Sequence, residues 1–376
     1  MKRTILMLVL GLVALALLLP GCTREKKITQ IIQPPTAAFV GSEACQACHA
    51  GIYNEFKKTG HPYKLVKAAD AQLPGFYPFT QIPGTPPNGA GNWDTVAYVI
   101  GGFWWKARFI GNSGYVMTSG GKNQYNFATQ QWVDYNKDKV TAYDCGPCHT
   151  TGYSATGNQE GRPGLIGTWA FPGVHCEACH GKGSLHSQDP QNYRMTIDRS
   201  ANLCGECHIR GSAYLIPAKG GFVEHHEQYN ELLASKKATF ECVDCHDPHI
   251  GLHPSNPNRT AAIKNKCETC HFEEAQAFQN SPIGEHPDVP LQCIDCHMAK
   301  TGKSAINPNQ YTGDVRSHIF SINTDSTAVM FTPDGKFANS YITLDFACLQ
   351  CHVGKTKGWA AGYADLIHPT TLMTSN

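Results

Sequence analysis

Charge of either sign is scarce in this sequence of 376 residues. Only 16% of the residues are Asp, Glu, Lys or Arg, and the formal net charge is +1. Neither this balance nor any basic run supports a nucleic-acid partner. Methionine is also rare, with seven residues, and no cysteine after Cys22 stands outside a C-x-x-C pair. The count of 17 cysteines is therefore the one unusual feature of the composition.

Long apolar runs are absent except at the N-terminus, where "ILMLVLGLVALALLLP" follows the basic "MKRT". This run is too short for a typical membrane span and predicts an export signal over residues 1–22. "LPGC" resembles a lipobox, which would make Cys22 the lipidated first residue of a lipoprotein. A plain cleaved signal and an uncleaved anchor are the alternatives. Residues 23–40 then form a polar tether, and we expect a lipid-anchored protein in the periplasm, at the outer membrane or on the cell surface.

The other sixteen cysteines form eight C-x-x-C pairs, each followed immediately by histidine. C-x-x-C-H is the attachment signature of c-type haem, in which two thiols bond to one edge of the ring and the histidine binds iron. Zinc sites and thioredoxin-like pairs do not need that histidine. The sequence therefore predicts eight covalently attached haems c, each with its iron. The attachment residues are Cys45, Cys48, Cys145, Cys148, Cys176, Cys179, Cys204, Cys207, Cys242, Cys245, Cys267, Cys270, Cys293, Cys296, Cys348 and Cys351. The proximal iron ligands are His49, His149, His180, His208, His246, His271, His297 and His352.

Ten further histidines are available for the opposite, distal side of each iron. A haem carrier fills both axial positions, whereas a haem enzyme keeps one open. His175 and His226 are predicted as spares; the distal candidates are His61, His186, His225, His249, His253, His286, His318 and His368.

Local context supports several of these candidates. Residues 48–62 and 270–287 each run from a haem-binding histidine through a helical stretch to a glycine and then His-Pro, presenting His61 and His286. Proline keeps the preceding residue out of helical conformation, so these histidines sit at helix ends. His225 and His226 are neighbours in an expected helix over 222–237, where only one can face a given ring.

The fold class we expect is mainly irregular, with short α-helices wrapped around a covalent haem chain. A small antiparallel β element is expected in the N-terminal part, where aromatic and β-branched residues alternate with glycine. In that part, "GGFWWKARF" (101–109) is either a docking or base-stacking surface or, as we prefer, a core wall. The expected organisation is 41–140 with the first haem, 141–352 with seven densely spaced haems, and a tail over 353–376.

Three segments resemble the bacterial multihaem c-type cytochromes: "GVHCEACHGKGSLH" (173–186), "CIDCHMAKTGK" continued by "GDVRSHIF" (293–320), and "CQACHAGIYNEFKKTGHP" (45–62). This family includes octahaem proteins, the tetrahaem acceptor of hydroxylamine oxidoreductase and extracellular filament cytochromes. The resemblance covers roughly 41–352 and implies that His186, His318 and His61 are distal ligands. It also implies electron transfer with donor and acceptor cytochromes as partners.

Two alternatives stay open. One is an octahaem reductase or oxidase acting on a small nitrogen or sulfur compound at one open haem. In this family such enzymes mark the catalytic haem by a proximal lysine, a cross-linking tyrosine or a missing distal ligand, and all eight motifs here end in histidine. The other is a homopolymeric filament, in which His368 could ligate a haem of the next subunit; we prefer ligation within its own chain.

Overall fold

The computed structural model describes residues 36–368. The predicted signal, the Cys22 lipidation site and all but the end of the tether lie outside these residues. Within them, no helix combines the length and the apolar character needed to cross a membrane.

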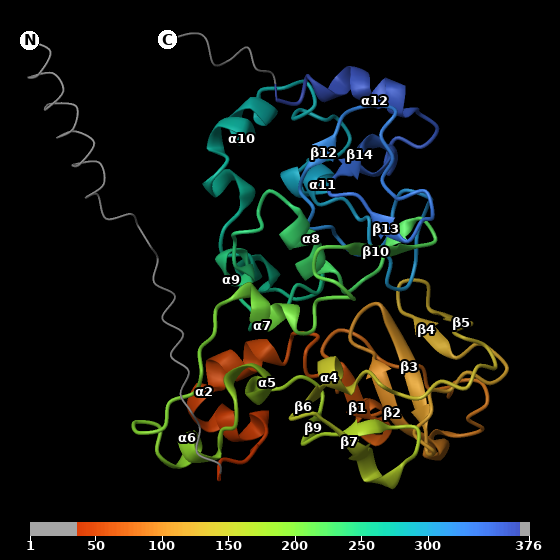
Figure 1. The fold of residues 1–376 in the computed structure, drawn as a ribbon, viewed down its shortest axis with the longest axis vertical. Coiled ribbons are helices and arrows are strands. Elements are labelled where there is room, and N and C mark those ends of the chain that lie inside the picture. Colours follow the sequence, from red (N-terminus) through yellow and green to blue (C-terminus); the bar gives the residue numbers. More distant parts are fainter. Residues whose placement is uncertain (1–35, 369–376) are drawn as a thin grey trace, which may run out of the picture.

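Short helices carry most of the haem motifs, and among the helices of residues 36–368 only α2 exceeds ten residues (Figure 1). The α-helices are α2 (Ser42–Phe56), α3 (Ala68–Ala71), α4 (Gly146–His149), α5 (Cys176–His180), α6 (Ser184–Gln188), α7 (Ala201–Gly205), α8 (Gln228–Ala234), α9 (Cys242–Cys245), α10 (Phe272–Gln279), α11 (Cys293–His297) and α12 (Lys357–Ala364). Single helical turns of other types are η1 (Trp93–Thr95), η2 (Gln159–Gly161), η3 (Arg259–Ala262), η4 (Cys267–Thr269) and η5 (Asp345–Leu349). The expected helices after the first and sixth motifs are confirmed as α2 and α10.

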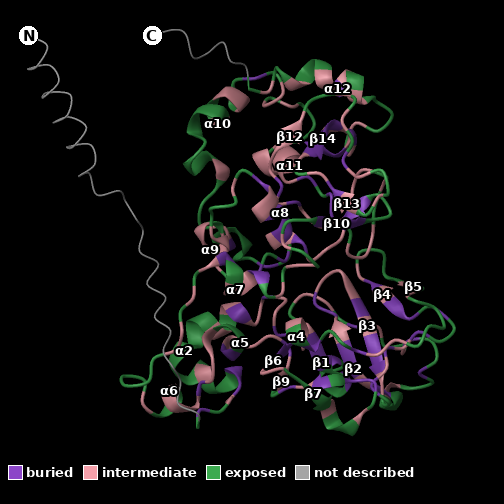
Figure 2. Ribbon diagram, viewed as in Figure 1, coloured by how far each residue is buried: buried purple, intermediate pink, exposed green. Residues whose placement is uncertain are grey.

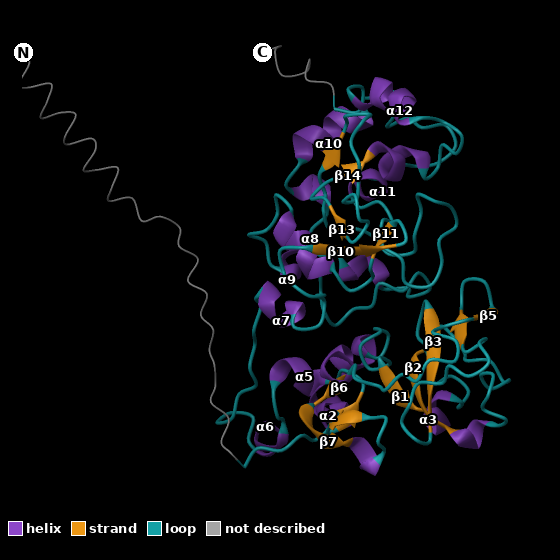
Figure 3. Cartoon of the chain, turned by 45° about the vertical axis from the view of Figure 1, so that its right-hand side comes forward, coloured by secondary structure: helices purple, strands orange, loops and turns teal. Residues whose placement is uncertain are grey.

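The strands form small sheets, and the largest is the antiparallel sheet expected in the aromatic segment. Its strands lie in chain order: β1 (Leu65–Lys67), β2 (Val96–Gly101), β3 (Lys106–Gly111), β4 (Gln124–Asn126) and β5 (Gln131–Val133). The remaining strands are β6 (Thr150–Thr151), β7 (Ser154–Asn158), β8 (Ile166–Thr168), β9 (Phe171–Pro172), β10 (Ile216–Lys219), β11 (Phe222–Val223), β12 (Ile322–Asn323), β13 (Phe337–Ala338) and β14 (Ile342–Thr343). The five-stranded sheet lies at the same end of the molecule as α2 and α5, and α8 to α12 occupy the other end (Figures 1 and 3).

The two largest clusters of buried side chains lie one in each of these parts, where Figure 2 shows buried residues along the strands. One packs Tyr63, Tyr77 and Phe103 against Val99 and Phe109 of the main sheet. The other gathers Ile216, Phe222, Ile319, Ile342 and Phe346 around β10 and β14. Phe103 is 6% exposed, so the preferred interpretation of 101–109 as a core wall is confirmed.

Each motif forms a helical turn for a local reason. The backbone N–H of His208 donates to the carbonyl of Cys204 at 2.9 Å, and His246 and His271 do the same with Cys242 and Cys267. This bond between residues four apart places both cysteines and the histidine on one face of the turn. Five consecutive residues are therefore enough to present three haem-binding atoms together.

The helix expected over 222–237 is wrong in its first half. Phe222 and Val223 belong to β11, because Gly220 and Gly221 adopt φ of +60° and +79° and turn the chain back onto β10. Only α8 is helical, so His225 and His226 lie in the connection before it.

Candidate haem sites

Six motif histidines face a second histidine from a distant part of the chain. The ring centroids are 6.3 Å apart for His49 and His186, 6.4 Å for His61 and His208, 6.1 Å for His180 and His249, 6.2 Å for His246 and His318, 6.0 Å for His286 and His352, and 6.0 Å for His297 and His368. Each pair joins one predicted proximal ligand to one predicted distal candidate.

This spacing tests whether the pairs fit an iron between them. Metal–imidazole bonds of about 2.0 Å and roughly 1.1 Å from nitrogen to ring centre put the centres of two ligating rings about 6.2 Å apart. All six pairs lie close to that value, whereas directly stacked rings approach more closely, as His225 and His226 do at 4.0 Å. The residues present therefore fit haem iron.

Hydrogen bonds orient many of these rings through the nitrogen that does not face the partner. Nδ1 of His180 donates to the carbonyl of Thr196 at 2.7 Å, and Nδ1 of His297 donates to that of Phe320 at 2.8 Å. On the distal side, Nδ1 of His186 donates to the carbonyl of Tyr193 at 2.7 Å. Such bonds fix the tautomer and leave Nε2 as the iron ligand.

Burial keeps several of the rings neutral, which metal binding requires. It lowers the pKa of His61 to about 3 and that of His246 to about 4, with smaller contributions from neighbouring Lys64 and His318. A neutral imidazole offers its lone pair without first losing a proton.

The carboxylate of Glu177, inside the third motif, ties the first haem site together. It accepts hydrogen bonds from the backbone N–H of Val40, Gly41 and Gly183 at 2.7–3.1 Å and is 2% exposed. Gly41 precedes α2, which carries His49, and Gly183 precedes α6, which carries His186. One buried side chain thus positions both members of the first pair.

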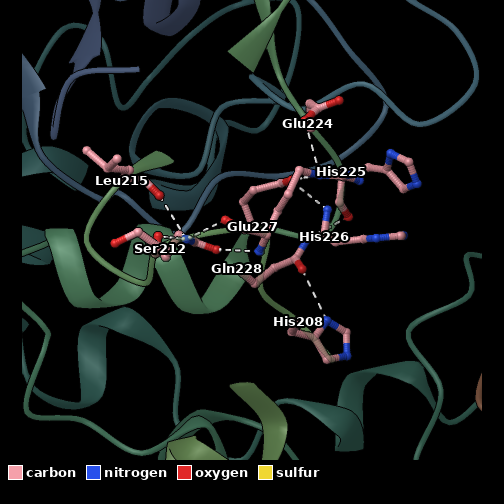
Figure 4. A network of polar contacts seen from close by, with 10 residues as sticks. His208, Ser212, Leu215, Glu224, His225, His226, Glu227 and Gln228 are labelled. Atoms are coloured by element: carbon pink, nitrogen blue, oxygen red, sulfur yellow. Dashed lines mark hydrogen bonds and ion pairs between the residues drawn. The ribbon is translucent and has the colours of Figure 1, made fainter. Parts of the chain in front are cut away.

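Residues of helix α8 also position histidines of the haem sites, in the middle of the chain (Figure 4). Oε1 of Gln228 accepts from Nδ1 of His208 at 3.1 Å, and the Glu231 carboxylate accepts from the backbone N–H of His318 at 2.8 Å. Asn230 binds the carbonyls of Ser212 and Leu215 and so holds the loop after the fourth motif.

Some predicted residues lie elsewhere. Both ring nitrogens of His175 are hydrogen-bonded, Nδ1 to Ser42 Oγ and Nε2 to the Pro172 carbonyl, each at 2.9 Å. His253, a distal candidate, is 7% exposed and stacks on Phe79 at 4.6 Å. Nδ1 of His253 accepts from the Ser255 backbone N–H, and no ring contact joins it to a motif histidine within 36–368. We therefore leave His253 out of the ligand set.

His149 of the second motif differs from the six paired histidines. Within residues 36–368 no ring contact joins it to a second histidine, although its charge acts on nearby His226, and its buried Nδ1 lacks a hydrogen-bond partner. Burial, and to a smaller extent the charges of Lys64 and Arg108, lower the pKa of His149 to about 3.

Basic side chains gather in this region, and we call them the cationic cluster: Lys64, Lys106, Arg108 and Arg210, together with His225 and His226, whose imidazoles burial keeps neutral. Burial lowers the pKa of Lys106 to about 7, aided by repulsion from Arg108. Burial lowers the pKa of His226 to about 2, with repulsion from Lys64, Arg210 and His149 adding to the effect. Arg210 forms ion pairs with Glu224 at 3.1 Å and Glu227 at 2.6 Å. The hairpin of β2 and β3 supplies Lys106 and Arg108, because Gly101 at φ +79° makes the turn before them.

Cysteines of different motifs also come together. Interaction with Cys207 lowers the pKa of Cys148 to about 7, and interaction with Cys242 lowers that of Cys204. The further thiol neighbours are Cys45 with Cys176, Cys179 with Cys204, Cys245 with Cys270, Cys267 with Cys293, and Cys296 with Cys348. Attachment points of different motifs therefore lie side by side.

Comparison with known proteins agrees with this geometry. A family model described as "Cytochrome c554 and c-prime" matches residues 113–181, which hold the second and third motifs. The multiheme cytochrome MtrA of Shewanella baltica is 22% identical over 178 residues, which are 45% of this chain and 49% of that protein. The match thus spans about half the length of that relative.

These matches make the chain similar to the multihaem c-type cytochromes. Three solved structures share its fold. The outer cell wall cytochrome OcwA is 19% identical with a TM-score of 0.54 and covers 87% of this cytochrome and 86% of its own chain. The octaheme sulfite reductase MccA of Wolinella succinogenes is 17% identical with a TM-score of 0.60, covering 84% and 65%. An undecaheme S-layer cytochrome of Carboxydothermus ferrireducens is 19% identical with a TM-score of 0.52, covering 90% and 61%.

Sequence reasoning missed the cationic cluster of this cytochrome. Its members come from four separate segments, none of which is a basic run. The segment "KAR" directly after the aromatic "GGFWW" was a weak signal. Charged residues are rarely buried without a partner, so two cations in an apolar hairpin indicate a specific interaction.

Proposed function

We propose that this cytochrome carries eight haems c and conducts electrons outside the cytoplasm, towards an outer-membrane or extracellular acceptor. The observation that carries the proposal is the set of six histidine pairs at 6.0–6.4 Å. A bound haem supplies an iron that gains and loses one electron. Two histidines on one iron hold its coordination constant during that change and exclude other ligands.

The thiol neighbours support an order for the path. The first motif has a thiol neighbour in the third motif. From the third to the eighth, each motif has a thiol neighbour in the motif that follows it along the chain. The second motif joins only the fourth through Cys148 and Cys207. We therefore propose one main path from the first to the eighth haem, with the second haem on a side branch.

The sparse packing around the sixth motif also favours haem as part of the core. Neither η4 nor α10 buries a residue, and the side chain of Phe272 is 64% exposed. A segment with so little buried apolar surface needs another hydrophobic partner to be stable. A covalently attached macrocycle supplies that surface.

Haem content and redox behaviour test the proposal together. Pyridine haemochrome and intact mass on the purified holoprotein should give eight haems per chain. Voltammetry of an adsorbed film without substrate should give reversible signals equivalent to eight electrons. A stoichiometry below eight, or zinc in place of iron, would contradict the proposal.

A second candidate function is reduction of a small nitrogen or sulfur oxyanion at the haem held by His149. It is favoured by the absence of a facing histidine within 36–368 and by the cationic cluster nearby, which would attract and neutralise an anion. MccA, which shares the fold, bears the name of a sulfite reductase. The side branch would supply the electrons.

Film voltammetry in the presence of sulfite, nitrite or hydroxylamine separates the two functions. A catalytic reduction current with one of these compounds, lost in Lys64→Met, would establish the reductase. Unchanged reversible signals with all three would leave electron conduction as the function.

The position of His368 bears on the alternative that this protein forms a filament. His368 faces His297 rather than His352 and lies in the same chain, so this pair needs no second subunit. The filament alternative would thus require another contact. Donor and acceptor cytochromes and a lipid anchor at Cys22 stay part of what we propose.

A further inference from the structure

His271 of the sixth motif is the other motif histidine without a facing histidine ring. A lysine takes the corresponding place: Nζ of Lys237 lies 3.0 Å from Nε2 of His271. In each of the six pairs, a distal histidine faces the motif histidine, as Lys237 faces His271. The sixth site therefore offers an amine where the others offer an imidazole.

The surroundings of Lys237 do not explain it as an ordinary surface cation. Within residues 36–368 no carboxylate forms an ion pair with it, and its Nζ instead lies 5.2 Å from the ring centre of Phe240 and 5.7 Å from that of Phe320. The adjacent Lys236 is exposed. Two neighbouring lysines thus point differently, and only Lys237 meets a haem motif.

The backbone fixes Lys237 in this orientation. Its N–H donates to Ser235 Oγ at 3.0 Å, and its carbonyl accepts from the Phe240 N–H at 2.9 Å, which closes a turn after α8. The same helix holds His318 through Glu231. The charge of Lys237 also acts on Cys245 and Cys267, so its amine lies between the fifth and sixth attachment sites.

The ring of His271 is aligned to match. Its Nδ1 lies 3.8 Å from Oε2 of Glu274, one turn further along α10. Nε2 carries the lone pair, because it accepts a hydrogen bond from the Lys237 ammonium. The lone pair of Nε2 and the amine of Lys237 point to one place between them.

We propose that Lys237 is the distal ligand of the haem attached at Cys267 and Cys270, so that the sixth iron has histidine and amine ligands. The neutral amine binds iron through its nitrogen lone pair, and its proton leaves to solvent. An iron between the two nitrogens needs them about 4 Å apart, so their separation would open by roughly 1 Å from that in the structure. The inference rests on the proposed haem content, and it leaves the second haem as the only open one.

Spin state and ligand spectroscopy on the oxidised holoprotein test this assignment. We would compare wild type with Lys237→Ala, Lys237→His and the control Lys236→Ala by EPR and near-infrared magnetic circular dichroism. Wild type should show one amine-ligated low-spin haem in the near-infrared. Lys237→Ala should convert about one haem per chain to high spin, Lys237→His should keep that haem low-spin without the amine band, and Lys236→Ala should match wild type.

Other outcomes would overturn the assignment. No gain of high-spin iron in Lys237→Ala, or no amine band in wild type, would reduce Lys237 to a hydrogen-bonding residue. The wild-type spectrum decides even if the variants fail to fold. Mass spectrometry of the peptide containing Cys267 and Cys270 separates the two proposals: without haem there, the proposed haem content fails rather than the lysine assignment.

Discussion

The imidazole rings of His180 and His249 are within 5° of parallel, and their centroids lie 6.1 Å apart. Each ring is held from its outer side, since His180 Nδ1 bonds the Thr196 carbonyl and His249 Nδ1 lies 3.2 Å from the Asp247 carboxylate. The two rings are therefore oriented by protein groups, independently of any metal. Preorganisation of this kind reduces the free-energy cost of forming the site.

Replacing His249 by alanine should open one iron. With Lys237 intact, we expect about one haem per chain to become high-spin. The total haem content should stay unchanged, because the two thioether bonds remain. His175→Ala is the matched control, since both ring nitrogens of His175 bind protein atoms. It should leave the EPR spectrum unchanged while lowering stability by about 1–3 kcal/mol through the lost hydrogen bonds. High-spin iron in the control, or none in His249→Ala, would contradict the pairing.

Replacing Glu177 by glutamine should destabilise the N-terminal haem site. The new NH₂ group would face backbone N–H donors of Val40, Gly41 or Gly183, so we expect the free energy of unfolding to fall by about 2–3 kcal/mol. Urea unfolding followed by circular dichroism measures this change.

Glu268→Gln is the control for that substitution, because Glu268 occupies the same position in its own C-x-x-C-H motif and is exposed. Its effect should stay within about 0.5 kcal/mol. Equal effects of the two substitutions would show that the bonds of the Glu177 carboxylate do not hold the site.

Cyanide should bind one haem only, at His149. If the second haem has no distal histidine and lies beside the cationic cluster, as we propose, optical titration should saturate at one equivalent. Lys64→Met removes one charge near this site and should weaken binding on the order of 10-fold, or about 1.4 kcal/mol. Lys139→Met, at an exposed position, should bind as wild type does. Binding at several haems, or at none, would contradict an open second site.

Removing the second haem should leave conduction along the chain intact. With an electrode at the N-terminal end and a photo-oxidant on exposed Lys355, we expect Cys145→Ser/Cys148→Ser to transfer electrons as wild type does. Cys242→Ser/Cys245→Ser removes the fifth haem from the main path and should slow transfer steeply. Similar rates in both double variants would be incompatible with the proposed branch.

The local features of this protein could be predicted from its sequence. Five consecutive residues form a single helical turn through a bond from histidine N–H to cysteine carbonyl, so the motifs were recognisable without a fold. The helices after the first and sixth motifs and the antiparallel aromatic sheet also follow from short-range patterns. In contrast, the connection before α8 was misjudged as helix, because pairing of β11 with β10 overrode its local preference.

Which groups face each other could not be predicted, because it depends on how distant segments pack. His186 meets His49 because the Glu177 carboxylate joins two distant backbone segments, and His368 meets His297 rather than His352. His253 was indistinguishable in sequence from the other His-Pro candidates but packs against Phe79, and Lys237 carried no local sign of its place beside His271. The physical reason is that a distal ligand is bound to its motif by no covalent or local constraint. Its place is set by burial and hydrogen bonds between segments far apart along the chain.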